Sequence, residues 1–144
     1  MSEADTRAQV AAIALTWEGT RYVNEARIKG VACDCTFVAS VYEEAGVIPH
    51  FEIGSYSPQW HLHQREERYL NTVLRFAREI EGPPQVGDLV LFKFGRVFSH
   101  SGIVIGWPTV VHAGFAERMV VRADASRGPL AERAQKFFSL WPRF

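Results

Sequence analysis

Apolar side chains recur every three or four residues through the first part of the chain, which is the spacing of a helix with one buried face. This pattern predicts helices over Thr6–Trp17, Cys35–Ala45 and His61–Glu81. Asp34 stands at the N-cap position of the second helix, which would put Cys35 in its first turn. The polar stretch 21–32 between the first two helices is predicted to be irregular.

After Gly82-Pro83-Pro84 the pattern changes to short runs rich in β-branched and aromatic residues, separated by glycine and proline. Such runs predict an antiparallel meander. Helices first and strands afterwards indicate an α+β domain, with N-terminal helices packed on a C-terminal antiparallel sheet. The predicted strands are Asp88–Phe94, Ser99–Ile105, Thr109–His112, Met119–Arg122 and, after a helical turn within 129–136, Phe137–Trp141.

Length and charge narrow the class of protein. The 144 residues suit a single domain spanning 1–144. Sixteen basic residues balance sixteen acidic ones, so a nucleic-acid binder that relies on a basic face is not expected. No apolar run is long enough to cross a membrane, and the polar residues 1–7 do not resemble a secretory signal. Synthesis in the cytoplasm is therefore expected.

The residue types that carry chemistry are a cysteine at a helix start and two histidines on neighbouring strands. Backbone N–H groups at a helix N-terminus favour a thiolate, which is the nucleophile of cysteine hydrolases. His100 opens one predicted strand and His112 closes the next, and a Gly-Trp-Pro turn separates the strands. The two imidazoles are therefore expected side by side at one sheet end, in a row with Cys35.

Several segments resemble the NlpC/P60 family of papain-like cysteine peptidases, which cleave cell-wall peptides. The resemblance covers about residues 6–142 and is most similar to the phage- and prophage-encoded branch. It implies a peptidoglycan stem peptide as substrate, often cut at the γ-D-glutamyl to diamino-acid bond. It also implies action in a phage tail or virion, or delivery to the cell wall. The segments are Gly19-Thr20-Arg21-Tyr22, Asp34-Cys35-Thr36, GDLVLF (87–92), SHSGIVIG (99–106) and Val111-His112-Ala113.

The resemblance also implies roles for individual residues. Cys35 would be the nucleophile, with its backbone N–H as an oxyanion donor, and His100 the general base and then the general acid. His112 would orient the ring of His100. No cofactor or metal is implied, since the C-x-C spacing and the His61-x-His63 pair match no usual zinc pattern. The residues expected to contact substrate, support the nucleophile or form the cleft wall are Tyr22, Asp34, Trp60 and Ser99.

One departure from the family pattern leaves alternatives open. Only Thr36 separates Cys35 from Phe37, where the family usually has two residues, so the spacing alone does not decide between Cys33 and Cys35. Cys35 is preferred because an acidic residue precedes it. The shortened spacing also fits a non-catalytic tail-assembly or structural domain that retains the fold. An amidase or acyltransferase acting on another substrate is the third candidate.

Overall fold

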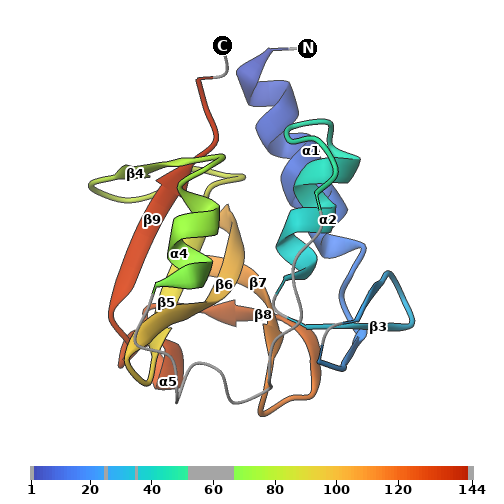
Figure 1. Cartoon of the computed structure of the whole chain (residues 1–144), viewed down its shortest axis with the longest axis vertical. Helices are drawn as coiled ribbons and strands as arrows, with labels where there is room; N and C mark the ends of the chain where they lie inside the picture. The colour runs from blue at the N-terminus through green and yellow to red at the C-terminus, as the bar shows by residue number, and fades with distance from the viewer. Residues whose placement is uncertain (1, 25, 35, 52–66, 143–144) are drawn as a thin grey trace.

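A computed structural model describes residues 2–24, 26–34, 36–51 and 67–142 of the chain. Most of its helical residues lie in the N-terminal half and most of its strand residues in the C-terminal half, and both termini lie at the same end of the molecule (Figure 1). None of its helices is both long and apolar enough to cross a membrane. The elements are α1 Glu3–Leu15, β1 Arg21–Tyr22, β2 Arg27–Ile28, β3 Ala32–Cys33, α2 Phe37–Glu44, α4 Arg68–Val73, β4 Arg78–Ile80, β5 Leu89–Phe94, β6 Val97–Gly106, β7 Thr109–Gly114, β8 Met119–Asp124, α5 Gly128–Ala131 and β9 Gln135–Ser139.

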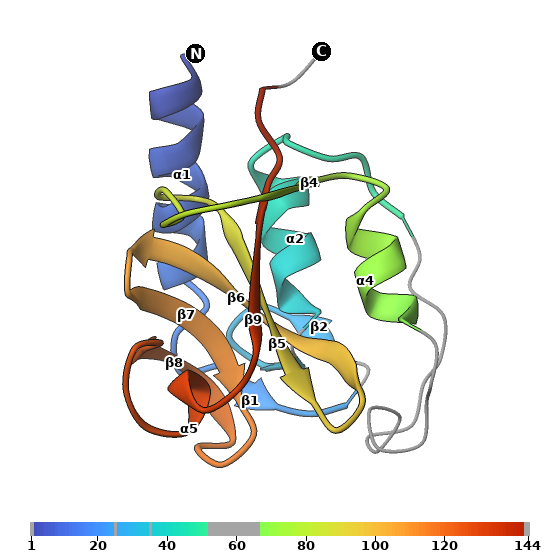
Figure 2. The same cartoon turned by 90° about the vertical axis from the view of Figure 1, so that its left-hand side faces the viewer.

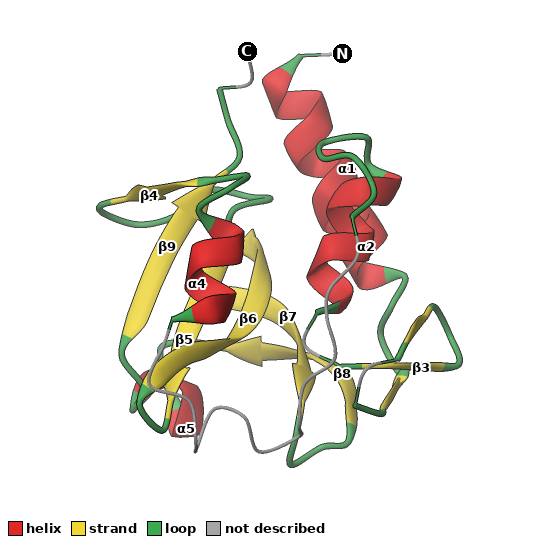
Figure 3. Cartoon of the chain, in the orientation of Figure 1, coloured by secondary structure: helices red, strands yellow, loops and turns green. Residues whose placement is uncertain are grey.

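The described strands form one sheet in the order β2-β3-β1-β8-β7-β6-β5-β9-β4. Strands β5 to β8 pair with one another in chain order and antiparallel, which confirms the predicted meander. The α+β class is also confirmed, because α1, α2 and α4 all pack against β6 (Figures 1, 2 and 3).

Alternate residues of the strands supply two apolar clusters, one on each face of the sheet. Leu91 and Ile103 face the helices, where they join Val10 of α1 and Val41 of α2. Their strand neighbours point the other way, towards α5 and its Leu130. The central strands β5, β6 and β7 are therefore buried on both faces over most of their length.

Helix α1 begins three residues before the predicted start. Ser2 accepts a hydrogen bond from the backbone N–H of Asp5, and the Asp5 carboxylate accepts one from the Ser2 N–H. This reciprocal capping box starts the helix ahead of Thr6, the residue at which the helix was predicted to begin. Thr6 instead donates its hydroxyl to the Ser2 carbonyl inside the first turn.

Helix α2 begins later than predicted, at Phe37, and Asp34 is not its N-cap. Thr36 occupies the cap position and makes no side-chain capping bond. The buried Asp34 carboxylate accepts hydrogen bonds from both the N–H and the hydroxyl of Thr36, at 3.0 and 2.5 Å. An aspartate that bonds two residues ahead makes a local turn, and this turn delays the helix.

The predicted helix over 61–81 is wrong in its second half, and residues 61–66 lie outside the described part. Helix α4 ends at Val73, and Arg78–Ile80 is strand β4, paired antiparallel with β9. The stretch 21–32, predicted to be irregular, contains β1, β2 and the first residue of β3. The pairing of β4 with β9 and of β1 with β8 joins residues distant in sequence and overrides the local pattern.

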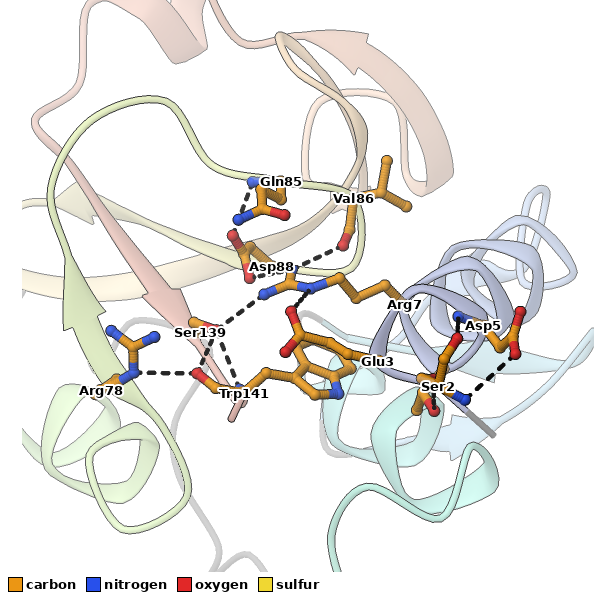
Figure 4. Close-up of polar contacts among 11 residues, drawn as sticks. Ser2, Glu3, Asp5, Arg7, Arg78, Gln85, Val86, Asp88, Ser139 and Trp141 are labelled. Carbon is orange, nitrogen blue, oxygen red and sulfur yellow. Dashed lines mark hydrogen bonds and ion pairs between the residues drawn. The ribbon is translucent and has the colours of Figure 1, made fainter. Parts of the chain in front are cut away.

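The turn before β5 ties both long helices to the sheet (Figure 4 draws its contacts with α1). The guanidinium of Arg7 in α1 donates to the buried Asp88 carboxylate at 2.7 Å and to the Val86 carbonyl at 3.0 Å. From α2, the Tyr42 hydroxyl donates to the Gly87 carbonyl at 2.7 Å. Gly87 has φ +87°, and a Cβ there would lie 3.1 Å from the Arg7 carbonyl oxygen, so only glycine fits.

Candidate active site

Two histidines meet on the central strands of the sheet. The pairing of β6 with β7 sets Gly102 opposite His112, and the Nε2 atom of His100 then lies 2.8 Å from the Nδ1 atom of His112. Both residues are buried, at 8% and 5% exposure. The structure therefore brings together the two imidazoles that the sequence spacing paired.

The environment of His112 determines which of the two imidazoles donates the proton in this hydrogen bond. Burial lowers the pKa of His112, and the nearby Glu117 charge opposes that shift in part. A neutral imidazole carries one proton, so His112 can accept at Nδ1 while His100 donates from Nε2. In this arrangement, a proton exchanged between His100 and another group would pass through Nδ1 of His100.

Aromatic rings and a glycine hold the pair in place. The ring of His100 packs against Phe92 and Phe94 of β5, with centroids 5.8 and 5.1 Å apart. Gly102 leaves room beside His112, because a Cβ added there would lie 3.4 Å from the His112 Cβ and 3.1 Å from the Val111 carbonyl oxygen. Close packing against β7 therefore explains why the SHSGIVIG segment has a glycine at position 102.

The described cysteine is poorly suited to act as a nucleophile. Cys33 is fully buried in the main apolar cluster. Burial, helped by the Asp34 charge, raises the pKa of its thiol to about 12, so the thiolate is scarce at neutral pH. Cys35 lies outside the described residues, between Asp34 and Thr36 of the turn that precedes α2.

The segment leading to position 35 belongs to the same sheet as the histidines. Strand β3 pairs parallel with β1, setting Cys33 beside Tyr22, and the N–H of Val23 donates to the Cys33 carbonyl at 2.7 Å. Strand β1 in turn pairs with β8, the neighbour of β7. The order of strands thus joins the predicted nucleophile segment to the histidine strands.

The remaining expected site residues are distributed as follows. Tyr22 is half-buried and packs edge-on against Phe115, with centroids 5.5 Å apart, three residues beyond His112. Ser99 is buried in β6 next to His100. Asp34 is buried in the turn before α2, as described above. Trp60 lies outside the described residues.

Sequence reasoning missed two polar contacts that hold the histidine strands. The Tyr69 hydroxyl of α4 lies 2.6 Å from the Ser101 hydroxyl of β6, and Arg7 pairs with Asp88 at the start of β5. The partners are 32 and 81 residues apart, and no local signal links them. No group of three or more His, Cys, Asp or Glu residues suited to hold a metal occurs among the described residues, and His61 and His63 are not among them.

No family model matches the chain. No curated protein matches it either. Solved structures do match its fold. It is similar to NlpC2 from Trichomonas vaginalis, with TM-score 0.69 and 15% identity, over 96% of this chain and 47% of that one. The chain thus spans about half the length of that protein.

Two further neighbours differ in what their descriptions say of activity. The NlpC/p60 domain of the peptidoglycan hydrolase SagA has TM-score 0.61 and 19% identity, over 90% of this chain and 96% of that one. RipD from Mycobacterium tuberculosis has TM-score 0.60 and 13% identity, over 93% and 96%. RipD is described as a non-catalytic NlpC/p60 domain protein adapted to peptidoglycan binding.

Proposed function

Because the chain has the NlpC/P60 fold, we propose that it is a cysteine hydrolase that cleaves amide bonds in peptidoglycan stem peptides. The observation that carries this proposal is the 2.8 Å contact between Nε2 of His100 and Nδ1 of His112 in a buried site. An oriented imidazole is what a cysteine nucleophile needs to lose its proton and later to protonate the leaving amine. The high pKa of the Cys33 thiol supports Cys35 as that nucleophile.

The proposed reaction has two steps. Nδ1 of His100 takes the proton of the Cys35 thiol, and the thiolate attacks the amide carbonyl. The tetrahedral intermediate collapses as His100 protonates the departing amine, which leaves a thioacyl-enzyme. Water, deprotonated by His100, then attacks the thioester, and the carboxylic acid and the free thiol are released. Throughout, His112 accepts the Nε2–H of His100 and fixes the orientation of its ring.

The finer assignments follow from the resemblance of the sequence segments. Stem peptides are the proposed substrate, with the γ-D-glutamyl to diamino-acid bond as the site of cleavage. Tyr22 would contact the substrate, since its contact with Phe115 puts it at the end of the strand that carries His112. Association with a phage tail or virion stays a prediction, and co-purification of the chain with such particles would test it.

The test is release of soluble peptide fragments from purified cell wall, followed by mass spectrometry. Release by the unmodified chain and by Cys33→Ala, together with its loss in Cys35→Ala, supports the proposal. Activity that survives Cys35→Ala and disappears in Cys33→Ala would reverse the nucleophile assignment. No release by the unmodified chain would exclude hydrolysis of this substrate.

The second candidate is a domain that binds peptidoglycan without cleaving it. Two observations favour it: the shortened spacing between Cys35 and Phe37, and the fold similarity to RipD. Co-sedimentation with insoluble cell wall, unaffected by Cys35→Ala and without any soluble product, would support this function over hydrolysis.

A further inference from the structure

The end of strand β7 holds a carboxylate beside the histidine pair. His112 and Gly114 are two residues apart in β7, so their side-chain positions lie on the same face of the sheet. The chain then turns through 115–118 and the Glu117 side chain folds back over Gly114. A Cβ added at Gly114 would lie 2.8 Å from the Glu117 carboxyl carbon. The carboxylate therefore fills the space next to His112 that a side chain at 114 would occupy.

We propose that Glu117 is a positioning residue that acts through His112 to stabilise positive charge on the histidine pair. The inference rests on the proposed function, in which His100 becomes an imidazolium in each step. His100 donates to His112, so the positive charge that develops on His100 is shared across the hydrogen bond. A carboxylate close to His112 favours this charged state. It offsets part of the penalty that burial imposes on the pair.

The surroundings of His112 make Glu117 an effective charge. The Nε2 atom of His112 is buried and has no hydrogen-bond partner among the residues that the structure describes, so Glu117 acts through space. The residues paired with His112 on β6 and β8 are Gly102 and Val121, and neither of them carries a charge. Glu117 itself is exposed, and solvent weakens but does not remove its field.

The other charged groups on the elements around the pair are basic or are engaged in an ion pair. Arg133 stacks on Phe94, the ring that packs against His100, at 4.0 Å from its centroid. Arg122 of β8 comes one residue after the one paired with His112, so its side chain lies on the opposite face of the sheet. It forms an ion pair with Glu18 at 2.9 Å. Arg118 lies in the turn beside Glu117. His100 is the titratable partner in direct contact. Of these groups, Glu117 is the carboxylate in the turn after β7, and its charge acts on His112.

The inference is tested with Glu117→Gln, which removes the charge and keeps the shape. Gly114→Ala is a second route, because its Cβ evicts the carboxylate while Glu117 remains. Glu81→Gln, on the exposed turn after the outermost strand β4, is the matched control. The first measurement follows the His112 ring signal by NMR as pH is varied, in the whole chain without substrate. The second is the pH profile of peptide release.

Glu117→Gln and Gly114→Ala should each lower the apparent pKa of His112 by about half a unit. The acidic limb of the pH profile should move to lower pH by a similar amount, since His100 must be neutral to take the thiol proton and its imidazolium loses its proton more easily. Glu81→Gln should change neither. Unchanged titration of His112 in both variants would overturn the inference. A shifted titration in a chain that releases no peptide would instead keep the Glu117 link and refute the proposed hydrolase.

Discussion

The Tyr42 hydroxyl donates a hydrogen bond of 2.7 Å to the Gly87 carbonyl, and this contact links α2 to the turn that starts β5. Burial, with the charge of Asp88 adding to it, raises the pKa of the Tyr42 phenol well above its ordinary value. The phenol is therefore protonated and remains a donor at any pH at which the protein is studied. One contact thus ties the helix that follows position 35 to the strand that flanks His100.

Tyr42→Phe should lower the free energy of unfolding by about 1–3 kcal/mol, because the Gly87 carbonyl is left without its buried donor. Urea unfolding followed by circular dichroism measures the change. The ring is retained, so the loss reports on the hydrogen bond rather than on packing. An unchanged denaturation midpoint would show that this contact does not stabilise the fold.

Asp88→Ala should destabilise the fold by about 2–3 kcal/mol, because it removes the buried one of the two carboxylates that pair with Arg7 and leaves Glu3 as the other. Glu79→Ala is the control, since it breaks an exposed pair with Lys136 and should cost at most about 1 kcal/mol. Thermal unfolding of the two variants gives the comparison. Equal losses would mean that the buried pair contributes no more than a surface one.

The two cysteines should differ in their reaction with iodoacetamide at neutral pH. In Cys35→Ala the remaining thiol is Cys33, whose burial and pKa of about 12 predict very slow labelling of the folded chain. In Cys33→Ala we expect fast labelling of Cys35. Mass spectrometry measures the labelling rates with and without denaturant. This comparison separates slow labelling caused by burial of the thiol from slow labelling caused by its low intrinsic reactivity. Rapid labelling of Cys33 in the folded chain would contradict the assignment.

His112→Ala should reduce kcat/KM for peptide release by roughly 100-fold or more, because the Nε2–H of His100 loses its acceptor. His112→Asn should recover part of the loss, since an amide oxygen can accept the same proton. Steady-state kinetics on the three forms measure the effect. If alanine and asparagine were equally active, orientation of His100 would not be the function of His112.

The lowered pKa of His112 predicts how stability depends on pH. The unfolded chain gains a proton on this residue as the pH falls below about 6.5, while the folded chain resists protonation until the lower folded pKa is reached. Stability should therefore be full above about 6.5 and decline between these two values. His112→Gln should weaken the decline. Urea midpoints measured at closely spaced pH values supply the test, and a flat profile in the unmodified chain would refute it.

The central sheet could be predicted because its strands carry their own signal. Strands β5 to β8 are runs of β-branched and aromatic residues with glycine at the turns, and the Gly-Trp-Pro turn gave the pairing of His100 with His112. By contrast, Arg78–Ile80 continues a helical pattern and becomes a strand only by pairing with β9, which lies nearly sixty residues later. A single sequence carries no trace of that pairing.

The supports of the candidate site were less accessible to prediction than the histidines themselves. Two-residue strands such as β1 and β3 are too short to show any period. The carboxylate of Glu117 reaches Gly114 only because of the shape of the turn between them. The burial of Cys33 depends on α1 and α2 closing over it. Each of these features arises from tertiary packing, so local propensity does not reveal it.

Strands β1 and β8 meet at one register pair, Arg21 with Met119, flanked by backbone bonds from Val120 to Thr20 and from Tyr22 to Arg118. In the described part of the sheet, this short β1–β8 pairing joins the segment that ends at Asp34 to the strands that carry the imidazoles. So brief a ladder frays more easily than the long β6–β7 pairing. Hydrogen exchange at the backbone amides of Tyr22 and Val120 should therefore report how often the β1–β8 pairing opens and the two halves of the candidate site separate.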